Sequence, residues 1–406
     1  MATKAPPGSR PARSAIEVRP LRQRQNRRNE LAIWWREIDR TLLVLVLVLM
    51  AIGTIAVAAA SPASARRLST SKIKLDDLHF FTIHLRWQAM GLIAMFGTSM
   101  FSRETARRFG IVLGFAMLAG LMLVPVMGFS VNGARRWLNL GMSLQPSEFL
   151  KPAFAIMMAW ILSWRVRDPH LPVIELCTAL MVLIGGLLML QPDFGSTILF
   201  GGVWFVMVLM SGISLKKIGA VFGAGLGGLV LAYMFYENGR HRIDAFLGGG
   251  TEFDQVDLAQ RTLTAGGWTG SGLWLGTKKL GLPEAHTDYI FSVIGEEFGL
   301  IACAVIVVLY LALVARVMLR LLDEEDLFTA LAAAGLTAQL GGQAFINILV
   351  NLQLFPSKGM TLPLISYGGS STIAICTGVG LLLAITRRNP FIRRERLSLR
   401  QLGLVK

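Results

Sequence analysis

Charged residues are scarce in this chain, and long apolar runs take their place. Of its 406 residues only 16% are charged and 53% are hydrophobic, with a mean hydropathy of +0.56. A soluble globular domain carries about a quarter charged residues, so the composition excludes an ordinary water-soluble fold. Apolar segments of roughly 20 residues, long enough to cross a bilayer, recur along the chain. Because backbone polar groups in lipid must be satisfied within their own segment, we expect an all-α polytopic membrane protein.

Cysteine and the common catalytic signatures are also rare or missing. The three cysteines, Cys177, Cys303 and Cys376, lie inside apolar runs. Such an odd, scattered set provides neither a disulfide framework nor metal-ligand spacing, and we expect these side chains to fill the core. No Ser/His/Asp triad, Walker loop, zinc spacing or dinucleotide fingerprint is recognisable. A cleavable signal peptide is not expected, because about 40 mostly polar residues precede the first apolar segment.

Positive charge is concentrated at the two ends. The net charge is +15; residues 1–40 contain ten Lys/Arg and four Asp/Glu, and residues 387–406 contain seven and one. Basic segments beside apolar spans are typical of cytoplasmic ends and are attracted to anionic lipid headgroups. No recognition motif accompanies this charge, so nucleic acid is not an expected partner. We interpret the ends as cytoplasmic tails, the first largely disordered, on either side of a membrane domain at 41–386.

Ten apolar segments predict the topology. They lie at about 42–60, 80–101, 109–129, 149–164, 172–190, 195–213, 218–236, 289–314, 327–352 and 370–386. Ten spans place both termini on one side, the cytoplasm. A long loop at 237–288, between the seventh and eighth spans, then faces outward; its five Lys/Arg and seven Asp/Glu agree with that side, whereas the four Lys/Arg of the first outward loop oppose it. Most of the varied polar sequence falls on the outward side, so we expect an extracytoplasmic active site.

Asp288 stands where the long outward loop meets the next apolar span, at the end of LPEAHTD. A partly desolvated carboxylate binds a proton more readily, which makes Asp288 a candidate general base. The simpler alternative, favoured by spacing alone, is an acid that caps the helix expected to begin at Tyr289. His286 and Glu284 could share the site, although a lone histidine beside a helix start is more often a hydrogen-bonding partner.

Other ionisable residues lie within or beside apolar spans. Glu296 and Glu297 lie about two turns beyond the start of the span after Asp288 if that helix is continuous. They could mark a pathway or, slightly favoured, pair with a cation on another helix. Glu148 and Lys151 are three residues apart and therefore share a helix face. They could pair with each other, or Lys151 could hold a diphosphate, and the residues alone favour neither.

Three more polar motifs belong to the outward side. Arg135 and Arg136 could bind phosphate through bidentate guanidinium contacts, or extend to lipid headgroups. Asp193 is interpreted as a turn former, with a cavity-lining role as the alternative. Ser370 opens the last span, after small residues whose backbone N–H groups could hold an anion at a helix N-terminus or which could serve close helix packing.

Five motifs resemble, in the same order, those of the SEDS family (shape, elongation, division and sporulation). They are NGARRWLNLG (132–141), LQPSE (144–148) followed by Lys151, QPDFG (191–195), LPEAHTDYIF (282–291) with GEEFG (295–299), and PLISYGGS (363–370). One such motif is weak, but five in register over about residues 42–386 are specific. The chain departs from the family at residues 273–279, where a Gly-Asn-Ser stretch is common, and this difference concerns the geometry of that loop.

The resemblance implies a ten-span glycosyltransferase that joins lipid II units into β-1,4 glycan and releases undecaprenyl diphosphate. It implies that Asp288 is the family's essential aspartate, and it gives Glu148 and Lys151 a role in the substrate cavity. A divalent cation, magnesium or manganese, is associated with the activity, although the sequence has no clear ligand cluster.

The resemblance also implies a place in the cell. PEAH at 283–286 is closer to the division pattern than to the elongation pattern, so we expect a septal member in the bacterial inner membrane. Its expected partners are lipid II, membrane lipids, a class B penicillin-binding transpeptidase and other division proteins. A lipid II flippase and a non-catalytic divisome scaffold are the alternative functions.

Overall fold

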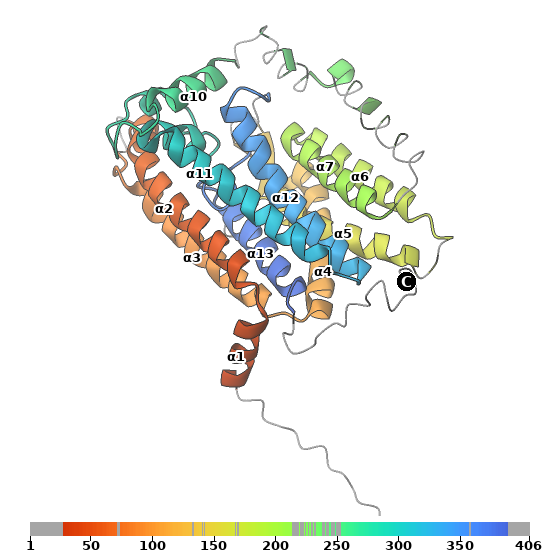
Figure 1. Ribbon diagram of the computed structural model, residues 1–406. Coiled ribbons are helices and arrows are strands. Elements are labelled where there is room, and N and C mark those ends of the chain that lie inside the picture. The colour runs from red at the N-terminus through yellow and green to blue at the C-terminus, as the bar shows by residue number, and fades with distance from the viewer. Residues whose placement is uncertain are drawn as a thin grey trace, which may run out of the picture.

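The computed structural model describes residues 27–70, 74–131, 134–139, 141, 143–166, 168, 170–212, 253–356 and 359–388, together with scattered positions between 219 and 248. These residues form a bundle of long helices (Figure 1). The helices are α1 (Arg27–Glu37), α2 (Arg40–Leu68), α3 (His79–Ser99), α4 (Arg103–Met127), α5 (Pro146–Ser163), α6 (Val173–Leu190), α7 (Phe194–Met210), α10 (Phe253–Ala265), α11 (Ile290–Leu321), α12 (Leu327–Asn351) and α13 (Ser370–Ile385).

The apolar segments seen in the sequence coincide with these helices. In the described part of the chain, six helices are long and apolar enough to cross a membrane: α2, α4, α5 with the short 3-10 turn η1 (Trp164–Val166), α6, α11 and α12. Helices α7 and α13 are apolar but shorter. Outside the described residues lie about half of the segment predicted at 218–236, most of the loop at 237–252 and most of both tails. The chain is therefore a multi-pass α-helical membrane protein.

Short polar side chains begin several of these helices. Asp39 accepts a hydrogen bond from the Leu42 backbone N–H at the start of α2 (3.2 Å), and Ser102 accepts one from the Thr105 N–H at the start of α4 (3.1 Å). Asp326 does the same for α12, at 3.0 Å from the Thr329 nitrogen. Each cap satisfies a backbone donor that the first turn leaves without a partner.

The expectation of an all-α fold missed a small antiparallel sheet between α4 and α5. Its strands are β1 (Phe129–Val131), β2 (Ala134–Asn139) and β3 (Ser143–Leu144), in the order β1-β2-β3. Phe129 pairs with Trp137, and Leu138 pairs with Leu144. These strands are too short for hydrophobic periodicity to reveal them, and they hold residues 134–139 against α4 and α5.

Helix α11 is broken at Gly299. This residue has φ +84° and ψ 172°, a backbone conformation that glycine adopts without steric cost. The helix is continuous from Ile290 to Phe298, so Glu296 and Glu297 lie about two turns beyond its start, and the break follows them. Residues 300–321, at about 1.5 Å per residue, extend about 33 Å, enough to cross the hydrocarbon core without residues 290–298.

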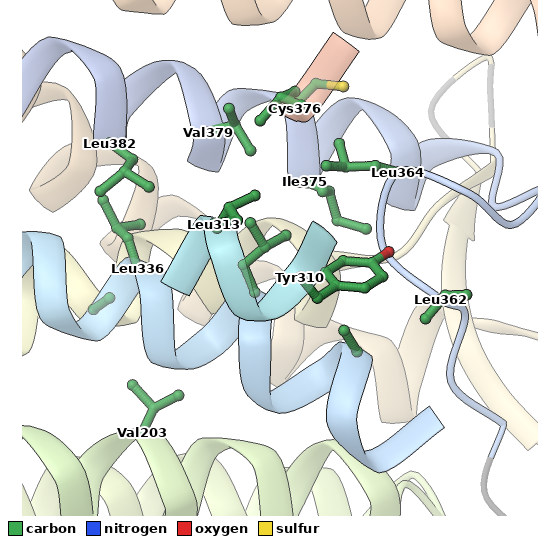
Figure 2. Close-up of a cluster of buried hydrophobic side chains, with 14 of the residues drawn as sticks. Val203, Tyr310, Leu313, Leu336, Leu362, Leu364, Ile375, Cys376, Val379 and Leu382 are labelled. Atoms are coloured by element: carbon green, nitrogen blue, oxygen red, sulfur yellow. The ribbon is translucent and has the colours of Figure 1, made fainter. Parts of the chain in front are cut away.

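The segment between α12 and α13 enters the bundle as non-helical backbone. Figure 2 shows Leu362 and Leu364 in one buried apolar cluster with Tyr310 of α11 and Ile375 of α13. The Tyr310 hydroxyl donates a hydrogen bond to the carbonyl of Pro363. Irregular backbone at membrane depth is tolerated where protein covers it. Residues 359–369 therefore form covered, non-helical backbone directly before the short apolar helix α13.

All three cysteines are free and buried in the helices, as expected from the sequence. They lie in α6, α11 and α13. They therefore serve as small apolar side chains in the core.

Candidate active site at the outer end of the bundle

Asp288 lies at the end of the bundle where α11 begins, immediately before the N-cap of α11. That N-cap is Tyr289, so Asp288 does not hold the capping position that spacing alone favoured. The Asp288 side chain is partly exposed. Its backbone carbonyl accepts hydrogen bonds from two side chains of α12, the amides of Asn347 (2.8 Å) and Asn351 (3.2 Å). The aspartate is thus held through its backbone, and the residue is only partly buried.

The two residues before Asp288 are held by residues 359–369. We call this non-helical stretch between α12 and α13 the re-entrant segment. Ser366 Oγ donates to the Thr287 carbonyl (2.6 Å), and the Tyr367 N–H donates to the His286 carbonyl (3.0 Å). Three consecutive carbonyls, at 286, 287 and 288, are therefore bonded to other parts of the fold. Such bonding fixes the direction in which the Asp288 side chain leaves the backbone.

Gly359 lies against the Asp288 carboxylate. A Cβ added at Gly359 would lie 3.5 Å from Asp288 Oδ2, an ordinary van der Waals distance. Asn347 also donates to the carbonyl of the next residue, Met360, at 2.7 Å. The same asparagine therefore connects the Asp288 backbone with the wall of the site.

Glu148 and Lys151 form a buried ion pair on α5. Lys151 Nζ lies 2.6 Å from Glu148 Oε1 and 3.4 Å from Gln343 Oε1 of α12. Gln343 in turn donates to the carbonyl of Thr361 (3.0 Å). Glu148 Oε2 is buried and has no hydrogen-bond partner among the described residues. A polar chain thus runs from Lys151 to the segment that lines Asp288.

The α12 residues that take part in this polar chain of side chains were not identified from the sequence. Gln343, Asn347 and Asn351 are spaced by four residues and are all buried. Residues at this spacing lie on one helix face. Polar amides repeated on one face of an apolar span were the available signal, because polar groups inside a membrane span need partners.

The two arginines of the NGARRW motif differ in their surroundings. Arg136 donates from Nε to the carbonyl of Gln191 (3.0 Å) and from a second nitrogen to that of Pro192. It also lies 3.9 Å from the Asp193 carboxylate. Arg136 therefore holds the turn between α6 and α7. Arg135 is exposed on the small sheet, where a guanidinium remains accessible to a phosphate or a headgroup.

Asp193 is the N-cap of α7. Its Oδ1 accepts from the Ser196 N–H (3.2 Å) and its Oδ2 from the Ser196 hydroxyl (2.9 Å). These bonds agree with the interpretation of Asp193 as a turn former. Its carboxylate is buried and already bonded at both oxygens.

His286 is buried among aromatic rings. Its Nδ1 lies 2.8 Å from Ser64 Oγ of α2, and its ring centroid is 4.3 Å from that of Phe80 and 5.2 Å from that of Tyr367. Burial lowers the pKa of His286 to about 4, which the Glu284 carboxylate only partly opposes. His286 is therefore neutral near pH 7 and supplies no positive charge for a diphosphate.

Glu284 and Ser370 also shape the outer end. Glu284 has φ +50°, and its carboxylate accepts from the Thr287 hydroxyl at 2.8 Å, which closes the turn before Asp288. Ser370 is the first residue of α13 and is buried. The N-cap of α13, Gly369, has φ +55°, so the helix begins directly after a sharp bend of the re-entrant segment.

Glu296 and Glu297 bind the loop that precedes Asp288. The Glu296 carboxylate accepts the backbone N–H groups of Lys278 (2.6 Å) and Lys279 (2.8 Å), which lie in the short 3-10 helix η2 (Lys278–Gly281). Glu297 accepts from the Lys279 ammonium and from the Trp274 N–H. Glu297 does pair with a cation, but this cation comes from the loop and not from another transmembrane helix, and Glu296 is bonded to backbone N–H groups alone.

Among the described residues, no three His, Cys, Asp or Glu side chains are grouped so that they could hold a metal ion, so the described side chains alone do not form a cation site. A cavity of about 460 Å³ is lined by Arg103, Arg107, Glu325 and their neighbours. It lies at the opposite end of α11 from Asp288, and we do not associate it with the reaction.

Known proteins resemble the chain over nearly its whole length. The sequence-family model of the FtsW, RodA and SpoVE cell cycle proteins matches residues 39–390. A relative from Caulobacter vibrioides, named probable peptidoglycan glycosyltransferase FtsW, is 34% identical and covers 89% of this chain and 93% of its own. A protein of the same name from Methylococcus capsulatus is 35% identical, with 86% and 89% covered.

Solved structures share the fold. A chain from a peptidoglycan synthase complex that coordinates polymerisation and crosslinking has a TM-score of 0.69 and 29% identity, and covers 86% of this chain and 97% of its own. The rod shape determining protein RodA of Thermus thermophilus has a TM-score of 0.63 and 28% identity, with 87% and 97% covered. From the matched family and the relatives above 30% identity, the chain belongs to the FtsW/RodA/SpoVE family of cell cycle proteins.

Proposed function

We propose that the chain is a peptidoglycan glycosyltransferase that polymerises lipid II into β-1,4 glycan and releases undecaprenyl diphosphate. The names of its relatives support this activity. The observation that carries the proposal is the fixed backbone of Asp288, whose carboxylate is partly exposed beside a polar chain that leads to Lys151. A base that must meet a substrate hydroxyl needs this combination of a rigid support and an accessible oxygen.

In the proposed reaction, the acceptor sugar's 4-hydroxyl attacks the anomeric carbon of the donor. The Asp288 carboxylate takes the hydroxyl proton as the new C–O bond forms, while the bond from the anomeric carbon to the diphosphate oxygen breaks. Proton transfer by a positioned base contributes roughly 10²–10⁴ in rate. The leaving diphosphate carries the electron pair away, and Arg135 and Lys151 are the cations that we assign to it.

Arg136, Asp193, His286, Glu284 and Ser370 have supporting roles in this proposal. Each shapes a turn or a helix start beside the site, and their contacts favour positioning over contact with the substrate. A divalent cation, magnesium or manganese, would take most of its ligands from water and the substrate diphosphate, as Mg²⁺ commonly does.

The proposed topology has ten spans with both termini in the cytoplasm. Residues 1–40 and 387–406 are then cytoplasmic tails, residues 41–386 form the catalytic membrane domain, and the loop 237–288 is extracytoplasmic. The basic tails support this orientation. We place the protein in the bacterial inner membrane at the division septum, because the relatives carry the name FtsW. A class B penicillin-binding transpeptidase and other division proteins are the proposed partners, and the synthase complex among the structural neighbours supports the first of them.

The test is polymerisation of purified lipid II by the chain in nanodiscs, alone and with its transpeptidase. Asp288→Asn should abolish long glycan while leaving the melting temperature unchanged. Asp77→Asn, at an exposed carboxylate 3.7 Å from Arg66, is the matched control and should polymerise normally. Long glycan from a folded Asp288→Asn protein would refute the role of this residue. Translocation of lipid II in liposomes without polymer would favour a flippase, and full cellular function of Asp288→Asn would favour a scaffold.

A further inference from the structure

Four large apolar side chains are exposed in the loop between α10 and η2. Trp268 is 73% exposed, Leu273 43%, Trp274 54% and Leu275 70%. An exposed apolar group of this size marks a surface that is covered by something else in the native setting. We call these four residues the tryptophan patch.

The patch is held rigidly against α11. The N–H of Leu300 donates to the Gly267 carbonyl (3.0 Å), and the N–H of Ile301 donates to the Trp268 carbonyl (3.3 Å). In the other direction, the N–H groups of Ser271 and Gly272 donate to the carbonyls of Glu296 (2.8 Å) and Glu297 (3.0 Å). The exposure of the patch is therefore a property of a well-bonded loop.

The contacts with α2 place the patch at the edge of the membrane. Helix α2 begins at Arg40, and roughly 20 residues cross the hydrocarbon core, so the boundary falls near residue 60. The Trp274 indole N–H donates to the carbonyl of Ala58 (3.1 Å), and the Lys279 ammonium donates to that of Ala59 (2.9 Å). Trp274 therefore lies at the boundary. Figure 1 shows α2 ending and α11 beginning at the same end of the bundle, and Asp288 lies two residues before α11.

The patch continues two apolar stripes of the transmembrane surface. On α11 the exposed residues Ile301, Val305 and Val308 follow one face of the helix, and Ile301 bonds directly to Trp268. On α2, Ile55 is exposed one turn below Ala58. The exposed apolar surface of these helices is therefore continuous with the patch at their ends.

We propose that the tryptophan patch inserts into the headgroup and acyl boundary of the leaflet at the Asp288 end, and so holds the catalytic loop at a fixed height in the bilayer. Tryptophan is enriched at this depth because its ring is apolar and its N–H is polar. Lys278 is exposed beside the patch, where its ammonium can meet lipid phosphates. The buried bonds of Glu296 and Glu297 connect the patch to the α11 start that follows Asp288.

Depth measurement by spin labelling tests this proposal without lipid II, so its outcome is independent of the proposed reaction. The three native cysteines are buried, which directs a nitroxide reagent to a cysteine introduced at the surface. The label goes on Leu275→Cys in the patch, on Val308→Cys as a membrane reference and on Leu68→Cys as an aqueous reference. Leu68 is ten residues beyond Ala58 on α2, about 15 Å further out.

The chain is studied alone in phospholipid nanodiscs, with oxygen and a water-soluble nickel chelate as relaxation agents. The Leu275 label should meet oxygen more often than nickel, at a ratio between the two references. A ratio equal to that of Leu68, or one that rises only after a transpeptidase is added, would overturn the proposal and assign the patch to water or to a protein partner. Tryptophan fluorescence provides a second readout that needs no label. The emission of Trp268 is obtained by subtracting the spectrum of Trp268→Phe from that of the native chain, and lipids brominated near the headgroup should quench it. Absence of that quenching would also overturn the proposal.

Discussion

Replacing Lys279 with methionine should destabilise the protein strongly, because it leaves a buried carboxylate without its cation. Lys279 is 3% exposed and the Glu297 side chain is fully buried. The ammonium also donates to the Ala59 carbonyl at 2.9 Å, so the substitution removes two contacts at once. Removal of one partner from a buried pair costs about 3–5 kcal/mol. An exposed pair contributes only about 0–1 kcal/mol, which sets the scale for a control.

A double variant separates the charge from the packing. In Lys279→Met/Glu297→Gln the buried charge is gone, and the amide oxygen can still accept from the Trp274 N–H. We expect the double variant to recover most of the lost free energy of unfolding. It should remain about 1–2 kcal/mol less stable than the native protein, at ~1 kcal/mol for each lost hydrogen bond. Arg66→Met, which breaks the exposed pair with Asp77, is the matched control.

The assay is denaturant or thermal unfolding of the purified chain, followed by polymerisation of lipid II with the variants that remain folded. The pair supports the loop that leads to Asp288, so kcat should fall more than KM changes. The reasoning is refuted if Lys279→Met costs no more than Arg66→Met, or if the added Glu297→Gln gives no recovery.

Three further outcomes are expected. Lys151→Met leaves the Glu148 carboxylate buried and unpaired, and should cost about 3–5 kcal/mol; adding Glu148→Gln should restore the melting temperature but not polymerisation. Because burial lowers the pKa of His286 to about 4 from 6.5, the unfolded chain takes up its proton first, so this stabilisation is complete above about pH 6.5 and lost as the pH falls toward 4. Melting curves should show that loss, at most about 3 kcal/mol, and His286→Phe should flatten it. Gly53→Ala would bring a Cβ within 2.6 Å of the re-entrant backbone and should lower the melting temperature and activity, whereas Gly97→Ala, with nothing within 4 Å, should do neither.

The positions of the helices could be predicted from the sequence because burial in lipid requires a long apolar run. The segments at 42–60, 149–164 and 327–352 each coincide with a described helix, α2, α5 and α12. The family could also be predicted, because five motifs occur in register, and the comparisons confirm it. The role of Asp288 follows from its motif and stays a prediction.

The sequence left open which side chains meet. For Arg136 it allowed a phosphate or a lipid headgroup, and the structure shows bonds to the turn at Gln191 and Pro192; the partner of Glu297 is a loop lysine 18 residues earlier in the chain. Hydropathy shows that a polar group inside a span needs a partner. It carries no information on the rotation and crossing of the helices that supply this partner. The small sheet after α4 and the break at Gly299 were missed for a related reason, since neither changes the apolar pattern over a whole span.

By itself the sequence determined that this chain crosses the membrane many times, which family it belongs to, and that Asp288 is the acid to test. Only the tertiary structure decided how that acid is supported. Asn347, Asn351 and the re-entrant segment 359–369 fix the carbonyls at 286–288, although they lie far from Asp288 in the chain. Partial exposure of one carboxylate on a backbone held in this way depends on helices packed around it, and no local pattern of residues encodes that packing.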